Sequence, residues 1–292
     1  YCGPTAESNW VIPGRLLVGA FPASTNDSET LYLLSAILKQ GVNKFVCLQE
    51  EFRPTGVPEE LWRSGQALRP YFDDVRHIVR NWQHFGFAWG QIATFEQLSF
   101  VHFPIQDCNV TDDDNVIELV RSLAESLGRG DVVYLHCWGG HGRTGTVVCI
   151  LLHLLYGLDA PTSLVRCQRV HDLRECPIDV QSPQTPLQRE QVVRVISKLM
   201  AQAQHAPMVR SRSPSAASVV SSGQFSDNDN AASTERDTTE SSEPDATAES
   251  CSEPEPPKST RYLSFSLPRT LSFFAFLRRA QQTDTDMVRV SA

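Results

Sequence analysis

The feature that most constrains the fold is a short apolar run, a glycine-rich turn and a longer apolar run between residues 132 and 152. Residues 132–135 read Val-Val-Tyr-Leu, and residues 146–152 read Thr-Val-Val-Cys-Ile-Leu-Leu. The turn at 136–145 reads His-Cys-Trp-Gly-Gly-His-Gly-Arg-Thr-Gly. This order predicts a buried strand, a loop and a buried helix. It favours an α/β fold with a mostly parallel central sheet flanked by helices.

The turn contains the residue types that bind a phosphate. Gly139, Gly140 and Gly142 let backbone N–H groups approach an anion closely, at a helix N-terminus that carries about half a positive charge. The planar guanidinium of Arg143 can grip two phosphate oxygens at once. These positive surroundings favour the nucleophilic thiolate form of Cys137. The turn therefore predicts a phosphate pocket with a reactive cysteine.

Residues 136–144 resemble the His-Cys-x5-Arg-Ser/Thr signature of the cysteine-dependent protein tyrosine phosphatase superfamily, and the flanking sequence resembles its dual-specificity branch. The resemblance implies a phosphomonoester hydrolase with a cysteinyl-phosphate intermediate and no metal or other cofactor. It makes Cys137 the nucleophile and Arg143 the ligand of substrate and transition state, while the Thr144 hydroxyl assists departure of the thiolate. His136 would brace the loop. The substrate pocket would be formed by Arg143 and the five intervening residues Trp138, Gly139, Gly140, His141 and Gly142.

An acid that protonates the leaving oxygen is expected on a loop after a strand. Residues 100–105 are the predicted strand, and Asp107 follows it, thirty positions before Cys137. A positioned carboxylic acid can supply this proton and later activate water as a base, and a mobile loop suits that role. The Phe-Pro-Ile-x-Asp sequence at 103–107 is similar to the acid loop of the family. The three aspartates at 112–114 are rival candidates, although capping of the next helix also explains them.

Residues 185–188, Thr-Pro-Leu-Gln, fit a capping box with threonine at the N-cap and glutamine at the third helical position. In relatives a glutamine placed here can orient the hydrolytic water, and Gln188 matches that position. Both interpretations stay open at this point. Gln184 is a second candidate for the same role.

The remaining elements follow from apolar runs and their flanking residues. We expect a turn and a short strand within 10–22, where residues 13–16 resemble the opening strand of the family, and a strand at 44–48. The segment 50–97 either covers an edge of the core or forms a wall of the substrate cleft. Helices are predicted at 28–40 with Asp27 or Ser28 as N-cap, 58–67, 73–82, 111–128 with Thr111 as N-cap, 144–156, 159–173 and from 185 onward.

Composition divides the chain into a phosphatase domain at 1–203 and a low-complexity, disordered tail at 204–292. The first part is rich enough in apolar residues for one sizeable core, whereas the serine-rich, acidic tail cannot offset the entropy of ordering. Residues 221–257 hold ten acidic residues and one basic residue. The segment 262–280 is basic and aromatic instead. It is a possible amphipathic helix for a membrane surface or a protein partner, or a sticky end without function.

Charge and cysteine usage limit the partners and the compartment. The net charge of −8 makes nonspecific nucleic-acid binding a poor expectation. Cysteines such as Cys47, Cys137 and Cys149 lie in apolar runs, which suits a reducing, cytoplasmic location. No apolar run is long enough for a transmembrane helix. The chain starts with Tyr1 rather than Met, so an N-terminal signal stays open. Cys47 or Cys149 is a candidate to trap an oxidised Cys137 as a disulfide.

Three functions are compatible with the signature. Phosphoinositide phosphatases of the superfamily often place lysines inside the loop, whereas here only His141 can add charge. A dual-specificity or tyrosine protein phosphatase acting on a phosphorylated protein is therefore favoured over a lipid or inositol-phosphate phosphatase. A non-catalytic phosphate-binding scaffold is the third possibility. Trp138 either lines the pocket floor or packs in the core.

Overall fold

The centre of the fold is a five-stranded sheet with the order β1-β2-β5-β3-β4. The computed structural model describes residues 1–88, 90–176 and 179–205. The strands are β1 (Ser8–Ile12), β2 (Leu16–Gly19), β3 (Lys44–Gln49), β4 (Ser99–Ile105) and β5 (Val133–His136). β1 pairs antiparallel with β2, and all other neighbours are parallel. The predicted α/β class with a mostly parallel sheet is confirmed.

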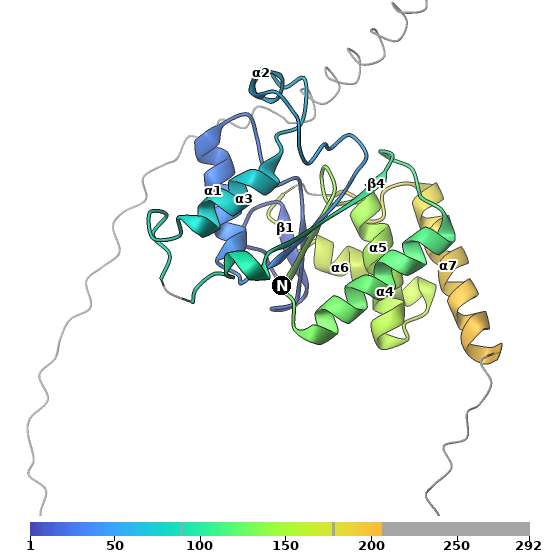
Figure 1. Ribbon diagram of the computed structural model, residues 1–292. Coiled ribbons are helices and arrows are strands. Elements are labelled where there is room, and N and C mark those ends of the chain that lie inside the picture. Colours follow the sequence, from blue (N-terminus) through green and yellow to red (C-terminus); the bar gives the residue numbers. More distant parts are fainter. Residues whose placement is uncertain (89, 177–178, 206–292) are drawn as a thin grey trace, which may run out of the picture. The chain divides into compact units, whose positions relative to one another are not determined.

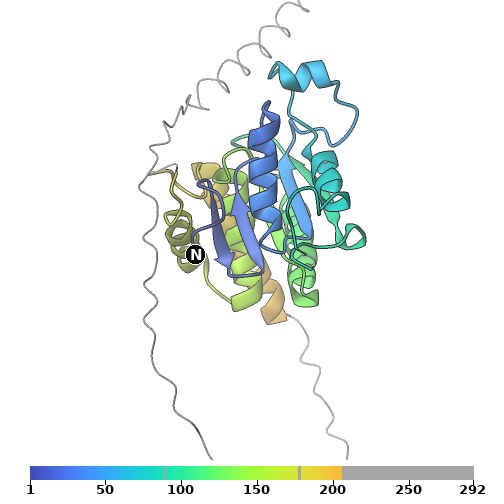
Figure 2. The ribbon, with the colours of Figure 1, turned by 90° about the vertical axis from the view of Figure 1, so that its left-hand side faces the viewer.

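Helices cover both faces of this sheet (Figures 1 and 2). They are α1 (Asp27–Leu38), α2 (Glu59–Arg63), α3 (Tyr71–Arg80), α4 (Asp113–Arg129), α5 (Gly142–Tyr156), α6 (Ala160–His171) and α7 (Pro186–His205), with a short 3₁₀ helix at Phe95–Gln97. α1 and α3 pack on one face, and α4, α5, α6 and α7 form the layer on the other. The short α2 stands away from the sheet in both views.

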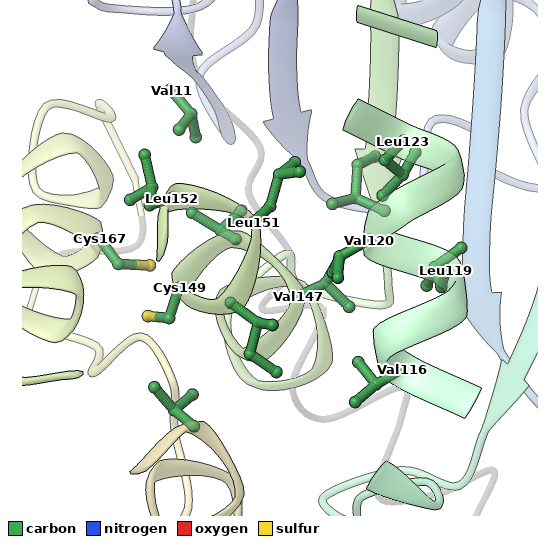
Figure 3. Close-up of a cluster of buried hydrophobic side chains, with 14 of the residues drawn as sticks. Val11, Val116, Leu119, Val120, Leu123, Val147, Cys149, Leu151, Leu152 and Cys167 are labelled. Carbon is green, nitrogen blue, oxygen red and sulfur yellow. The ribbon is translucent and has the colours of Figure 1, made fainter. Parts of the chain in front are cut away.

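The larger core cluster surrounds α5 (Figure 3). Residues 142–152 of this helix are all buried, because α4, α6, α7 and the sheet surround it. A helix enclosed in this way is apolar on every side, as the sequence of its run indicated. Its N-terminus is thereby fixed at the end of β5, where the glycine-rich loop lies.

The smaller core cluster shows what part of the segment 50–97 does in the fold. Five residues of α3 are buried against β3, β4 and α1: Tyr71, Phe72, Val75, Ile78 and Val79. The segment therefore covers a face of the sheet rather than an edge. Its first residues also reach the candidate site, as described below. The structure thus favours the covering role, and a wall of the substrate cleft stays a prediction.

Several predicted helix ends were wrong by one to four residues. Asn26, not Asp27 or Ser28, caps α1, because its side chain accepts a hydrogen bond from the Glu29 N–H at 3.1 Å. Asp112, not Thr111, caps α4, which ends at the left-handed Gly130 rather than at 128. The predicted helices at 58–67 and 73–82 are α2 and α3, which are shorter or shifted toward the N-terminus. Runs of capping residues offer adjacent choices, and local sequence does not select among them.

The helix after the glycine-rich loop begins at Gly142, two residues before the predicted start. Gly157 ends it in the left-handed conformation, as predicted. Among the described residues no single helix is long and apolar enough to cross a membrane; α5 and α6 satisfy the criterion only together, and the chain bends by 119° between them. The tail, with the possible amphipathic segment at 262–280, lies outside the described residues.

Candidate active site

The candidate site lies where three neighbouring parallel strands end. β5, β3 and β4 lie side by side in the sheet, and Cys47 of β3 pairs in register with His136 of β5. The loops leaving these strands carry Cys137 after β5, Glu51 after β3 and Asp107 after β4. Ligands of open α/β sheets bind at this edge, beyond the carboxyl ends of the strands. The topology thus collects residues that are far apart in sequence.

Arg143, in the first turn of α5, is held by hydrogen bonds from two loops, and its side chain is 1% exposed. Its Nη1 donates to Glu51 Oε2 and to the Ile105 carbonyl oxygen, both at 2.9 Å. Its Nη2 donates to Glu51 Oε1 at 3.0 Å and to Asp107 Oδ1 at 2.9 Å. These bonds use four of the five N–H groups of a guanidinium. The fifth group, Nε–H, is not used in these bonds, so it is the donor that could bind a ligand.

Glu51 is a residue that the sequence did not single out. Both of its carboxylate oxygens accept from Arg143, which makes a bidentate ion pair. Burial opposes the charged form of Glu51, but the Arg143 guanidinium holds the pKa of that carboxyl below its usual range. Burial also opposes the charge of Arg143, whose pKa is nevertheless raised by Cys137 and Glu51. The available signal was position, because Glu51 follows the buried strand beside β5 by two residues.

Asp107 is the predicted acid that contacts Arg143, with 2.9 Å between Oδ1 and Nη2. The three rival aspartates have other partners. Asp112 caps α4, and its Oδ1 accepts from the Asp114 N–H at 2.8 Å. Asp113 and Asp114 pair with basic residues of α7. Geometry therefore favours Asp107 among the four.

His136 connects the loop to α3. Its Nδ1 lies 3.1 Å from the Cys137 carbonyl oxygen, and its Nε2 lies 2.7 Å from the Tyr71 hydroxyl. Burial lowers the pKa of His136 to about 3, so the ring is neutral at physiological pH. Because a carbonyl can only accept, Nδ1 donates to it, and Nε2 accepts from the Tyr71 hydroxyl. This arrangement fits the predicted bracing role, and Tyr71 is a partner that the sequence did not suggest.

The back of the loop is held by a second buried arginine, Arg174, which follows α6. Its Nη1 and Nη2 donate to the carbonyl oxygens of Gly139 and Gly140, both at 3.0 Å, and its Nε donates to Asn9 Oδ1 at 2.6 Å. Gly140 has a φ of +72°, and a Cβ there would lie 2.3 Å from the Gly19 carbonyl oxygen. Carbonyls fixed at the back of a loop leave peptide N–H groups to face the other way. The loop is therefore shaped as an anion-binding nest.

The two large side chains of the loop have internal partners. The ring of Trp138 stacks on Phe21, with centroids 6.1 Å apart, which corresponds to the packing alternative. His141 Nδ1 lies 2.8 Å from His171 Nε2. Burial, with a contribution from Arg174, lowers the pKa of His141 to about 3 and that of His171 to about 4. At physiological pH, His141 therefore adds no positive charge to the loop.

The hydroxyl of Thr144 is buried at the start of α5, and among the described residues it has no hydrogen-bond partner. Buried hydroxyls are nearly always bonded, so an orphan in a native structure needs an explanation. A reacting group in the pocket would supply the missing partner. This observation agrees with the role that the resemblance implied for Thr144.

Gln188 forms the predicted capping box. Its Oε1 accepts from the Thr185 N–H at 3.0 Å, and its own N–H donates to the Thr185 hydroxyl at 3.2 Å. Its Nε2 also donates to the Asn109 carbonyl oxygen at 3.2 Å. The buried side chain lies against the loop, because a Cβ on Gly142 would be 2.7 Å from its amide. The exposed Gln184 lies outside this arrangement.

A sequence profile of the family described as "Swiss Army Knife protein, DSP-PTPase phosphatase domain" matches residues 74–209. This stretch includes Asp107, the glycine-rich loop with Cys137 and Arg143, and Gln188. Residues 74–209, just under half of the chain, therefore form a phosphatase domain similar to the dual-specificity branch of the cysteine-dependent protein tyrosine phosphatase superfamily. The predicted family is thereby confirmed.

Two known relatives of this phosphatase domain match over parts of their length. "Putative tyrosine phosphatase 067L" of Invertebrate iridescent virus 3 is 29% identical over 89 residues, which are 28% of this chain and 37% of the viral protein. "Phosphatidylinositol 3,4,5-trisphosphate 3-phosphatase cnrN" of Dictyostelium discoideum is 27% identical over 135 residues, 44% of this chain and 18% of that protein. The chain thus spans well under half of either relative.

Solved structures of low sequence identity are also similar to this phosphatase domain. The crystal structure of Tk-PTP in the active form has a TM-score of 0.43 and 19% identity, covering 66% of this chain and 97% of that one. The crystal structure of PTPMT1 in complex with PI(5)P has a TM-score of 0.42 and 16% identity, covering 67% and 98%.

Two buried cysteines of the phosphatase domain bear on the predicted redox trap. Cys47 lies on β3, which pairs with the strand β5 that leads into the glycine-rich loop. Burial raises the pKa of its thiol. Cys149 and Cys167, from α5 and α6, direct their sulfurs toward each other (Figure 3), and burial raises the pKa of Cys149 as well. Thiols with raised pKa values are weak nucleophiles. Trapping of an oxidised Cys137 by Cys47 or Cys149 stays a prediction.

Proposed function

We propose that this chain is a phosphomonoester hydrolase that acts on phosphorylated tyrosine, serine or threonine of proteins through a cysteinyl-phosphate intermediate. The observation that supports this most is Arg143. It is buried and bonded to Glu51 and to Asp107, at the edge of the sheet where the Cys137 loop begins. A buried guanidinium that is bonded to an acid, beside the loop that carries a nucleophile, suits the transfer of a phosphoryl group.

In the first step the Cys137 thiolate attacks phosphorus, and the ester bond between phosphorus and the leaving oxygen breaks. Asp107 donates a proton to that oxygen, so an alcohol or phenol leaves rather than its anion. Arg143 and the loop N–H groups bind the phosphoryl oxygens while charge develops on them. The products are the released alcohol and phosphocysteine.

In the second step water attacks the phosphocysteine. Asp107, now a carboxylate, takes a proton from the water, and the bond between sulfur and phosphorus breaks to release inorganic phosphate. The Thr144 hydroxyl donates a hydrogen bond to the departing Cys137 thiolate. This assignment is supported by the buried position of that hydroxyl, which has no hydrogen-bond partner among the described residues. Gln188 is close enough to the loop, at Gly142, to help place the water.

Substrate binding requires Asp107 to change partners. Bidentate binding of a phosphate uses two adjacent N–H groups of Arg143, and the Nε–H is the one without a partner described above. Its neighbour on Nη2 is bonded to Asp107. The incoming phosphate therefore replaces Asp107 at the guanidinium. The released carboxylate can then take a proton from solvent and turn, as a carboxylic acid, to the leaving oxygen.

The favoured substrate class is a phosphorylated protein, and the second candidate is a lipid phosphate. The neutral His141–His171 pair supports the first, because it adds no charge for a second phosphate group. The relative named as a phosphatidylinositol 3,4,5-trisphosphate 3-phosphatase supports the second. Comparing turnover of a phosphopeptide panel with that of phosphoinositides in vesicles tests the choice. Faster turnover of the lipids would overturn our preference.

A turnover assay with p-nitrophenyl phosphate distinguishes an enzyme from a phosphate-binding scaffold. We expect the full chain to hydrolyse p-nitrophenyl phosphate and Cys137→Ser to lose this activity. We expect Asp107→Ala to be slower, and the loss to reach about 10²-fold or more on esters with poor leaving groups. Binding of phosphopeptide without turnover by the wild-type chain would favour the scaffold. A cytoplasmic location, and docking of the segment 262–280 on a membrane or a partner, stay predictions.

A further inference from the structure

We propose that Gln191 of α7 is a positioning residue for the acid Asp107, and that one face of α7 fixes the loop on which this acid lies. The inference rests on the proposed function and adds a residue that neither the signature nor the capping box contains. It starts from the loop between β4 and α4, residues 106–112. This loop carries Asp107 and contacts α7 along its length.

Three side chains, from the N-cap residue of α7 and from its first two turns, donate to three carbonyl oxygens of this loop. The Thr185 hydroxyl donates to the Cys108 carbonyl at 3.4 Å. Gln188 Nε2 donates to the Asn109 carbonyl at 3.2 Å. Gln191 Nε2 donates to the Thr111 carbonyl at 2.6 Å. Residues three apart are neighbours on a helix surface, so the three donors form one oblique row at the start of α7.

Gln191 makes the shortest of the three contacts, and unlike Thr185 and Gln188 it is not part of the capping box. Its side chain is 1% exposed, and its Nε2 also donates to Asp113 Oδ1 at 3.0 Å. It therefore binds both the end of the loop and the first residue of α4. Arg194, one turn further along, continues the row with an ion pair to Asp113.

The loop itself needs such support because its backbone is locally strained. Cys108, directly after Asp107, has a φ of +57°, a conformation that non-glycine residues rarely adopt. Inside the loop, the Asn109 side chain bonds to Gln106 and to the Val110 N–H. Strained residues persist only where their surroundings hold them in place. The row on α7 is the external part of those surroundings, and it determines where Asp107 starts when it leaves Arg143.

The test uses aryl phosphates that differ in how much their leaving group needs a proton. Phenyl phosphate needs the acid, whereas 2,4-dinitrophenyl phosphate has a leaving group that departs unprotonated. Gln191→Met keeps the size of the side chain and removes its donors. We expect kcat for phenyl phosphate to fall about 10-fold, and kcat for the dinitrophenyl ester to change less than about 2-fold, since acid catalysis contributes only to the first.

Val195→Ala is the matched control. Val195 lies in the same helix, is fully buried in the larger core cluster and makes no contact with the loop hydrogen bonds described above. Its truncation should lower the melting temperature while the ratio of the two rates stays at the wild-type value. Should Gln191→Met fail to fold, Gln191→Asn makes the same test, because its shortened amide cannot reach Thr111.

Three results are informative. A ratio that changes in the Gln191 variants but not in Val195→Ala supports the inference. Equal losses on both esters, or no loss on either, would overturn it and leave the proposed function intact. No turnover of any aryl phosphate by the wild-type chain would overturn the proposed function, and this inference with it.

Discussion

At the scale of the residue, Arg143 is held by carboxylates that lie 92 and 36 residues away along the chain. Each contact fixes a different property. Glu51 fixes the plane of the guanidinium through two bonds, and Asp107 occupies the donor that a phosphate would take. Removing one partner should therefore affect binding of the phosphoryl group before it affects folding.

Glu51→Ala should lower kcat/KM for p-nitrophenyl phosphate by about 10- to 100-fold, because a guanidinium that is no longer held can move by an ångström. Steady-state kinetics at neutral pH measure this loss. Glu50→Ala is the control, since the neighbouring Glu50 is exposed. Equal effects of the two substitutions would show that Glu51 acts only as a surface charge.

Tyr71→Phe removes one hydroxyl with little change of volume. Because it leaves Nε2 of the buried, neutral His136 without its donor, we expect the free energy of unfolding to fall by about 1–3 kcal/mol. Urea denaturation measures this change. Tyr32→Phe is the matched control, because Tyr32 is 65% exposed, and its effect should stay within about 0.5 kcal/mol. An unchanged midpoint for Tyr71→Phe would mean that water or another group replaces the hydroxyl.

At the scale of the element, the loop between β5 and α5 depends on close approach to β2. Gly140 combines a positive φ with a backbone oxygen of β2 in the position that a Cβ would occupy. A side chain there must displace either the loop or the strand. The shape of the pocket is therefore set by packing between elements as well as by the loop sequence.

Gly140→Ala should weaken binding of vanadate by more than about 10-fold and lower kcat in parallel, because loop N–H groups move away from the oxyanion. Isothermal titration and steady-state kinetics measure both. Gly128→Ala is the control: Gly128 lies in α4 with open space around its Cβ position, and alanine should stabilise that helix by about 0.5–1 kcal/mol. Unchanged vanadate affinity in Gly140→Ala would contradict the close-approach argument.

Local pattern predicted the elements well and their contacts poorly. The strand, loop and helix around Cys137 follow from apolar runs and glycines, which depend on neighbouring residues alone. Glu51 and Arg174 reach the site through the fold: Arg174 bonds to Gly139 across 35 residues and to Asn9 across 165. The spacing of neighbouring residues in the sequence does not predict such long-range contacts. The N-caps of α1 and α4 were missed for a different reason, since adjacent polar residues compete for one N-terminus.

At the scale of the whole molecule, buried neutral histidines couple stability to pH. An unfolded histidine binds a proton near its ordinary pKa of 6.5, whereas burial lowers the pKa of His136 and His141 to about 3. Between these values the unfolded state binds more protons, so stability decreases as pH falls. The Arg143 guanidinium also keeps the pKa of Glu51 below its usual range, which adds to this loss at lower pH.

We therefore expect the urea midpoint to fall between pH 7 and pH 5, with a loss of up to about 2 kcal/mol for each fully buried histidine. Denaturation followed by tryptophan fluorescence at both pH values measures this change. His84→Gln is a control, because that side chain is exposed and its effect on the pH dependence should be small. A midpoint that rises toward pH 5 would contradict the neutral state of the buried rings.

The double engagement of Arg143 also has a consequence for the end of the catalytic cycle. Inorganic phosphate leaves a guanidinium that Asp107 can bind again as a carboxylate, once the proton it took from water has passed to solvent. Re-formation of that ion pair favours expulsion of the product and disfavours its return. We therefore expect inorganic phosphate to inhibit an enzyme with this geometry less than one in which no carboxylate competes for the arginine.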